Sequence, residues 1–358
     1  MNQNELGGRI VAHADEWAKA IVDLQYTRHP DLTARYGGTG YAKCLEDTRH
    51  VLIYLGESVV ADSPQLFEHF IGWVRTVFLA YGVHEEDLVS LLVILREHLA
   101  SVLPCEALPV VAVHIDVAEA MLRSPFQSPP VQVDPSAPHG ALATQYLEVL
   151  LKSDRFAAST LIRSAVADGV SVRDVYLHVL QPVQREVGRL WQTRRISVAQ
   201  EHYATAVTQL VMSQLYPLNF SSNKNGLRLV ATCVGGELHE LGIRMVADIF
   251  EMDGWDSCYL GANTPAESVV RTVVERNADV LAISATMTSL VPRVAAIVDA
   301  VRKQGLAHVV VMAGGYPFNL VGDLWKRVGA DRYAATADVA PSIALDLVRQ
   351  RRSAVHKS

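Results

Sequence analysis

Cysteines are scarce in this sequence, and it has no long hydrophobic run. The four cysteines have the spacing of neither a metal site nor a disulfide framework; they are Cys44, Cys105, Cys233 and Cys258. No uninterrupted apolar stretch approaches about 18 residues, so no membrane span is expected. The first residues show no basic stretch followed by an apolar core, so no secretory signal is expected. These features predict a cytoplasmic protein.

The sequence also has no excess of positive charge. Its 32 lysine and arginine residues stand against 38 aspartate and glutamate residues, which gives a net charge of -6. Such a chain has no overall electrostatic attraction to nucleic acid, so we expect neither nucleic acid nor a membrane as a partner. Half of the 358 residues are hydrophobic, enough to fill the cores of about two to three domains.

Prolines are concentrated in one stretch that begins at Ser124 and continues past Pro129 and Pro130 to Pro138. Such a proline density is incompatible with a helix and predicts an extended linker. A second break, Ser221 to Gly226, precedes the first expected strand. The predicted organisation is a helical sensor domain at 1–123, a linker at 124–140, a helical cap at 141–222 and an α/β domain at 223–358.

Both regions before the α/β domain show the three- and four-residue apolar spacing of helices. In the first region we expect helices at Arg9–Leu24, Ala42–Val60, Pro64–Tyr81, Glu85–Val102 and Leu108–Leu122, which suggests an all-α globin-like or phycobilin-like bundle. In the second we expect a four-helix cap formed by Ala141–Lys152, Arg155–Ala167, Val172–Trp191 and Val198–Leu215. Ser197 and Gln200 have the spacing of a capping box for the last helix. No basic stripe or recognition helix indicates DNA binding.

One histidine lies at the end of an expected strand. The apolar run Leu227–Val234 is followed by two glycines and then by His239, just before an expected helix. Two further apolar runs, 280–283 and 309–313, end at Ser284 and at the pair Gly314 and Gly315. In a parallel sheet such loops lie side by side at the edge where open α/β folds bind ligands. His239 is therefore a candidate metal ligand, although most isolated histidines are surface or capping residues.

The spacing of these strand ends resembles a known family. Between Gly242 and Ser284 lie 41 residues, and between Thr286 and Gly314 lie 27. This pattern is similar to the cobalamin-binding domain of methionine synthase, corrinoid methyltransferase proteins, mutases and cobalamin photoreceptors, over residues 226–352. That resemblance implies a flavodoxin-like, doubly wound parallel sheet of five strands.

The resemblance also implies roles for individual residues. His239 would replace the cofactor's own dimethylbenzimidazole as the lower cobalt ligand. Ser284 would hydrogen-bond the buried nucleotide tail, and Gly314 and Gly315 would leave room for it. A neutral imidazole suits cobalt, and Glu237 can accept a hydrogen bond from its second nitrogen.

The chain departs from the family pattern at two positions. Glu237 stands where the family mostly has aspartate, which changes the reach of the carboxylate but not its chemistry. Thr286 replaces the usual leucine, and Thr288 keeps a hydroxyl two positions on. Gly242 retains the glycine of the family motif.

Trp191 is followed, after nine residues, by the pair Glu201 and His202. This pattern resembles the cap of light-sensing adenosylcobalamin proteins, in which the tryptophan packs against the adenosyl group and the glutamate contacts its ribose. Read alone, it is also compatible with ordinary core packing. Those photoreceptors have a histidine directly after the tryptophan, whereas this chain has Gln192. His202 is the nearest replacement as an upper cobalt ligand.

A helical domain joined to a cap and a cobalamin domain resembles the photocobilins, which hold biliverdin beside cobalamin. The supporting stretches run from Tyr36, Gly37 and Gly38 to Tyr54 and Leu55, with Cys44, Arg49 and His50, and from Phe70 to Trp73. Bilin propionates need basic partners, for which Arg35, Arg49 and Arg75 are available. Each of these arginines can equally be an ordinary solvated side chain.

Our first hypothesis from the sequence is a light sensor without catalytic activity. It would bind adenosylcobalamin and biliverdin, change its homo-oligomeric state in light and signal to a separate effector protein, since only a short basic tail follows Leu347. The alternatives are a corrinoid carrier for methyl transfer and a haem-binding redox sensor. His69 and His98 are the candidate haem ligands, with a core or surface role as the simpler interpretation.

Overall fold

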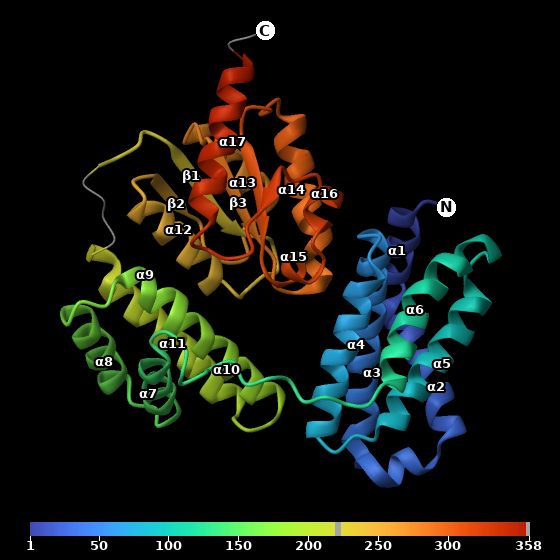
Figure 1. The fold of residues 1–358 in the computed structure, drawn as a ribbon. Coiled ribbons are helices and arrows are strands. Elements are labelled where there is room, and N and C mark those ends of the chain that lie inside the picture. The colour runs from blue at the N-terminus through green and yellow to red at the C-terminus, as the bar shows by residue number, and fades with distance from the viewer. Residues whose placement is uncertain (219–222, 356–358) are drawn as a thin grey trace. The chain divides into compact units, whose positions relative to one another are not determined.

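The computed structural model describes residues 1–218 and 223–355. They form two compact units. The first comprises 1–128 together with 287–292, and the second comprises the described residues of 129–286 together with 293–355 (Figure 1). None of the described helices combines the length and the apolar character needed to span a membrane.

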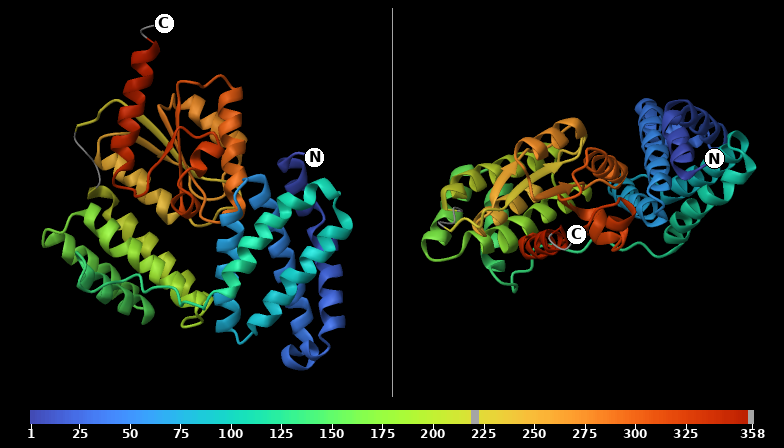
Figure 2. Two further views of the ribbon diagram at one scale, coloured as in Figure 1. Left: turned by 45° about the vertical axis from the view of Figure 1, so that its right-hand side comes forward. Right: turned by 90° about the horizontal axis from the view of Figure 1, so that it is seen from above.

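The first unit is a bundle of long helices (Figure 2). They are α1 (Gln3–Ala12), α2 (Ala14–Arg28), α3 (Asp31–Val60), α4 (Pro64–Ala80), α5 (Glu85–Val102) and α6 (Leu108–Arg123), with a short 3₁₀ turn η1 (Cys105–Ala107) before α6. The expected helix 9–24 is two helices that meet at His13. Helix α3 begins eleven residues before the expected Ala42, because it continues through a glycine-rich stretch with a kink at Gly37, where φ is 65°.

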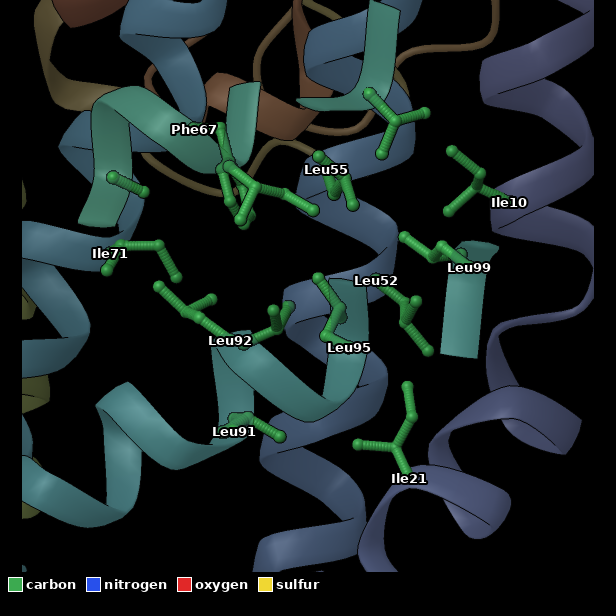
Figure 3. Close-up of a cluster of buried hydrophobic side chains, with 14 of the residues drawn as sticks. Ile10, Ile21, Leu52, Leu55, Phe67, Ile71, Leu91, Leu92, Leu95 and Leu99 are labelled. Carbon is green, nitrogen blue, oxygen red and sulfur yellow. The ribbon is translucent and has the colours of Figure 1, made fainter. Parts of the chain in front are cut away.

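Aliphatic side chains fill the interior of this bundle. Ile10, Leu52, Leu55 and Leu95 from three different helices meet there with no solvent exposure (Figure 3). Leucines have well-defined rotamers and pack densely, so the bundle is held together mainly by burial of apolar surface.

The second unit begins with the second half of the expected linker. Val133 belongs to the hydrophobic core of the cap, and the backbone N–H of Gln132 donates to the buried carboxylate of Glu186 at 2.9 Å. Residues 129–139 are therefore packed against the cap and do not form a free spacer.

The cap contains α7 (Gly140–Leu151), α8 (Arg155–Ala167), α9 (Val172–Asp174), a π-helical turn η2 (Val175–Leu180), α10 (Gln181–Gln192) and α11 (Val198–Leu215), ending in η3 (Tyr216–Leu218). The expected capping box of α11 is confirmed: Ser197 and Gln200 exchange side-chain and backbone hydrogen bonds. The core of the cap also includes Met245, a residue of the α/β domain that is 2% exposed.

The α/β domain is a parallel sheet of five strands in the order β2-β1-β3-β4-β5. The strands are β1 (Arg228–Cys233), β2 (Asp256–Tyr259), β3 (Val280–Ser284), β4 (Val310–Gly314) and β5 (Arg332–Tyr333). The connecting helices are α12 (Leu241–Met252), α13 (Ala266–Glu275), η4 (Thr288–Leu290), α14 (Val291–Lys303), α15 (Tyr316–Leu320), α16 (Leu324–Arg327) and the final α17 (Ala340–Val355).

Strands β1, β3 and β4 are almost continuously apolar because both faces of the sheet are covered. Helices α12 and α17 pack on one face, against alternate residues such as Ala231 and Ala282. In the register of the sheet Cys233 pairs with Ser284, and Ser284 with Gly314. The strand order reverses between β1 and β3, which is where sheets of this kind bind ligands. The expected helical N-terminal region, cap and five-stranded flavodoxin-like sheet are confirmed.

Candidate functional site

The loop after β1 carries His239 and is fixed by its neighbours. Its turn requires glycine at Gly236, where φ is 83°. The backbone N–H of Gly236 donates to the side-chain oxygen of Asn263 at 2.6 Å, and the N–H of Asn263 donates to the carbonyl of Glu237 at 2.9 Å. Arg293 donates to the carbonyl of Gly235 at 2.6 Å. The loop is therefore held in place before any ligand is bound.

Glu237 orients the imidazole of His239. Its Oε1 accepts from Nδ1 of the ring at 2.6 Å and from the backbone N–H of His239 at 2.9 Å. The carboxylate is fully buried, whereas the histidine side chain is 61% exposed. Since Nδ1 is engaged, Nε2 is the ring nitrogen left for a metal.

Both pKa values in this pair are shifted. The hydrogen bond to Glu237 raises the pKa of His239 against the opposing effect of burial. Burial would raise the pKa of Glu237, but hydrogen bonds from the ring and backbone of His239 and from the backbone of Thr286 hold it below its usual range. The pair therefore favours an ionised carboxylate that keeps a proton on Nδ1.

The ends of β1 and β3 are joined through the second oxygen of the same carboxylate. Oε2 of Glu237 accepts from the backbone N–H of Thr286 at 2.6 Å. Thr286 thus contributes its main chain to this bond, which any residue except proline can do. Ser284 is buried at the end of β3, beside Gly314 in the register. The predicted site residues of β1, β3 and β4 are therefore brought to one edge of the sheet.

The three predicted glycines differ in what they do. Gly315 has a φ of 104°, and a Cβ there would lie 2.0 Å from the carbonyl oxygen of Ala285, so the fold itself requires glycine. A Cβ on Gly314 would meet only the oxygen of Ile283, at 3.9 Å, and one on Gly242 would meet nothing within 4 Å. A side chain would therefore meet open space at Gly242 and an ordinary van der Waals contact at Gly314.

The sequence reasoning missed Glu240, the residue after the histidine. Its Oε1 accepts from the side chain of Gln209 in the cap at 2.7 Å, and its Oε2 accepts from Tyr259 at 2.7 Å and from the backbone of Ala262 at 3.1 Å. Burial and this hydrogen bond raise the pKa of Tyr259. Only its position beside His239 could have drawn attention to Glu240, because its partners are distant in sequence.

The predicted cap residues lie at the junction of α10 and α11. Trp191 and Gln192 end α10 and are half-buried. Glu201 is in the first turn of α11, 3.4 Å from the exposed ring of His202. After the hydrogen bond and charge of Glu237, the charge of Glu201 contributes in a small way to the raised pKa of His239.

Thr288 is not part of this arrangement. It is buried in η4, within the segment 287–292 that belongs to the first unit. Its hydroxyl as a cofactor contact stays a prediction.

The arginines proposed for bilin propionates have carboxylate partners within their own unit. Arg35 makes two hydrogen bonds with Asp87, and the buried Arg75 pairs with Glu85 at 2.7 Å. Arg49 pairs with Asp15. The geometry therefore favours a structural role for the three arginines, each in an ion pair.

A cavity of about 310 Å³ lies between α2 and α3, and its charged lining consists of Asp15, Lys19, Glu46 and Arg49. Two carboxylates therefore offset two cations, which gives an anionic bilin no net attraction. Burial raises the pKa of the Cys44 thiol to about 11, so it is a poor nucleophile for attaching a chromophore.

The histidines suggested for haem have ordinary structural surroundings. Burial lowers the pKa of both His69 and His98. The ring of His98 packs edge-on against Trp17, with ring centroids 5.8 Å apart. A core role accounts for this packing.

Two family models match the second unit. Both are described as a B12 binding domain, one at residues 227–342 and the other at 142–216. The first range covers the strand ends described above, and the second covers the cap. Residues 1–141 lie outside both ranges.

Curated relatives match about two fifths to just over half of the chain. Dimethylamine corrinoid protein 3 of Methanosarcina mazei is 30% identical over 139 residues, which are 38% of this chain and 81% of that protein. Dimethylamine corrinoid protein 1 of Methanosarcina acetivorans is also 30% identical over 139 residues, but this match spans only 63% of its length. Monomethylamine corrinoid protein 1 of Methanosarcina mazei is 26% identical over 208 residues, 56% of this chain and 94% of that protein.

Among solved structures, the monomethylamine corrinoid protein of Methanosarcina barkeri has a similar fold. The TM-score is 0.52 at 24% identity, covering 59% of this chain and all of that one. The matches support cobalamin binding. They give no support to the expected photoreceptor, to the adenosyl form of the cofactor or to biliverdin.

Proposed function

The chain belongs to the family of B12-binding corrinoid proteins that includes the methylamine corrinoid proteins, and we propose that it is a corrinoid carrier for methyl transfer, without catalytic activity of its own. The methyl group would be exchanged with separate methyltransferases. This function is the alternative that the sequence left open beside light sensing.

The observation that carries the proposal is the imidazole of His239, held at Nδ1 by a fully buried carboxylate while its ring is 61% exposed. A neutral imidazole is a good cobalt ligand, and a carboxylate on its other nitrogen fixes both tautomer and orientation. A Cβ on Gly242 would meet no atom within 4 Å, so the first turn of α12 presents no side-chain obstacle at that position. The donor chemistry of the residues present therefore fits cobalt, the metal of a corrin.

The roles of the chain's own residues follow from this geometry. Glu237 keeps the proton on Nδ1, so that the lone pair of Nε2 is available to the metal. Its buried position fixes the ring along one direction, which lowers the entropy cost of coordination. Bound cobalamin would supply a cobalt atom that accepts and gives up a methyl group on its upper face.

On the opposite face, the residues at the junction of α10 and α11 would control access. The size of Trp191 counts against a carrier in one respect, because it would crowd a reacting substrate; in a closed cap it would shield an apolar methyl group from water, and Glu201 and Gln192 would supply polar groups beside it. The cap would have to give way to a methyltransferase at each transfer. The helices of residues 1–123, which lie outside the matched ranges, are our candidate for docking that enzyme.

The experiment compares two loaded forms of the purified chain, one with methylcobalamin and one with adenosylcobalamin. Retention, absorption spectrum and size in gel filtration are recorded before and after green light. A carrier retains both forms and keeps its size after illumination. If only the adenosyl form is retained, and light then changes the oligomer, the carrier proposal is wrong and light sensing replaces it.

A further inference from the structure

Two carboxylates flank His239 and tie its loop to different parts of the molecule. Glu237, two residues before it, is bonded to the end of β3 through the backbone of Thr286. Glu240, the residue after it, is bonded to the end of β2 through Tyr259 and to the cap through Gln209. The histidine thus sits between a bond within the sheet and a bond to the cap.

The contact between the side chain of Gln209 and Glu240 differs from other polar links between cap and α/β domain. Arg244 donates to Ser213 at 2.8 Å and to the backbone carbonyl of Gln209 at 3.4 Å, Tyr176 donates to Asp248 at 2.7 Å, and Arg173 pairs with Asp253. These contacts involve residues within or beyond helix α12. Gln209 alone of these partners reaches the residue next to His239.

We propose that Glu240 is a positioning residue through which helix α11 of the cap sets the conformation of the His239 loop. Glu240 is the N-cap residue of α12, and its carboxylate does not cap the helix but bonds Tyr259, Ala262 and Gln209, which fixes the residue at which the loop becomes helix. Oε2 keeps its bonds to Tyr259 and Ala262 when α11 moves, whereas Oε1 loses Gln209. A shift of the cap would therefore loosen one side of the loop without releasing it.

This inference rests on the proposed function for its consequence. A methyltransferase that displaces the cap from the upper face would at the same time change how firmly the imidazole is held on the lower face. The two faces of the cofactor would then be coupled through the hydrogen bond between Gln209 and Glu240, without the need for a hinge.

The first test needs no cofactor. Gln209→Leu removes the donor from the cap and leaves the rest of the network in place. Gln214→Leu is the matched control, because Gln214 lies on the same helix but accepts from Ser159 within the cap. We expect amide hydrogen exchange in residues 236–242 to be at least about threefold faster in Gln209→Leu and unchanged in Gln214→Leu. Equal exchange in all three proteins would overturn the inference.

The second test uses the protein labelled with ¹⁵N in its histidines, loaded with cobalamin and reduced to cobalt(II). In its electron paramagnetic resonance spectrum the ¹⁵N of the protein imidazole splits the cobalt lines into doublets, whereas the ¹⁴N of the cofactor's own dimethylbenzimidazole splits them into triplets. We expect the fraction without the histidine nitrogen to rise severalfold in Gln209→Leu and more in Gln209→Glu, which places a second carboxylate against Glu240. The control variant should match the unaltered chain, and unchanged fractions in both Gln209 variants would refute the coupling.

The two proposals fail in different ways. If the unaltered chain binds no cobalamin, or if no histidine nitrogen coordinates cobalt, the proposed function is wrong. Hydrogen exchange then still decides whether Gln209 positions the loop. If Gln209→Leu does not fold, as circular dichroism would reveal, the isosteric Gln209→Glu provides both measurements.

Discussion

The side chains of Glu237 and His239 are joined by one hydrogen bond, although the acceptor is fully buried and the donor ring is mostly exposed. A buried carboxylate is costly unless its lone pairs are used. Here two backbone N–H groups and the ring supply three donors. The charged carboxylate of Glu237 is therefore buried at the edge of the sheet, whereas the imidazole of His239, the candidate cobalt ligand, lies at the surface.

Removal of either member of this pair should weaken cobalamin binding. We expect His239→Ala to lower the affinity for cobalamin at least about tenfold and to abolish coordination of cobalt by a histidine imidazole. We expect Glu237→Gln to lower the affinity about 10- to 100-fold. Titration followed by absorption measures both. His308→Ala is the control, because His308 is exposed and precedes β4 at the opposite edge of the sheet. Full affinity in His239→Ala would remove that residue from the metal.

The stability of the cofactor-free chain should depend on pH through His239. Its folded-state pKa is raised, so its contribution is fully present below the unfolded value of about 6.5 and is lost as the pH rises through the folded value. Because the ring is exposed, we expect the difference between the chain and His239→Ala to be under about 1 kcal/mol. Urea unfolding measured on both sides of this window gives the difference, and a larger difference at the alkaline side would contradict the assignment.

Binding of cobalt should show the opposite trend with pH. Metal and proton compete for imidazole, so affinity should fall as the solution is acidified. The raised pKa of His239 moves this loss to a higher pH than an isolated histidine would give. Affinity that does not vary with pH would indicate a ligand other than His239.

Gly314, the last residue of β4, and Gly315, which follows it, should respond differently to substitution by alanine. Gly315→Ala forces a side chain into a left-handed conformation and against the oxygen of Ala285, so we expect a loss of at least about 2 kcal/mol in stability. Gly314→Ala meets no such obstacle and should leave the cofactor-free chain nearly unchanged, but it should weaken cobalamin binding. Thermal unfolding and cofactor titration separate the two effects; equal stability losses would be inconsistent with the geometry.

The buried bond between Tyr176 and Asp248 should stabilise the contact of the cap with α12. Tyr176→Phe leaves the acceptor unsatisfied, and we expect it to cost about 1–3 kcal/mol. Tyr203→Phe is a suitable comparison, because its hydroxyl bonds a carbonyl at an exposed site within the cap. Urea unfolding measures both. A Tyr176 variant as stable as the unaltered chain would show that packing alone holds the interface.

The sheet and its ligand edge could be predicted because parallel strands covered on both faces are continuous apolar runs. The ends of 227–234, 280–283 and 309–313 therefore located His239, Ser284 and Gly314 without knowledge of the fold. The local signals of a capping box were equally sufficient for Ser197 and Gln200.

Features set by tertiary contacts could not be predicted. Helical turns on both sides of the kink at Gly37 include residues of low helix propensity, and the linker at Gln132 is held by Glu186 from 54 residues away. Thr286 acts through its backbone, which the side-chain pattern does not reveal. Glu240 depends on where the cap docks.

Met245 lies on a helix of the sheet domain but is packed in the hydrophobic core of the cap. A boundary drawn at the start of β1 would therefore cut through a shared core. Grafting this cap onto another carrier would require α12 to travel with it, and a chimaera joined between α11 and β1 would expose a methionine-sized gap.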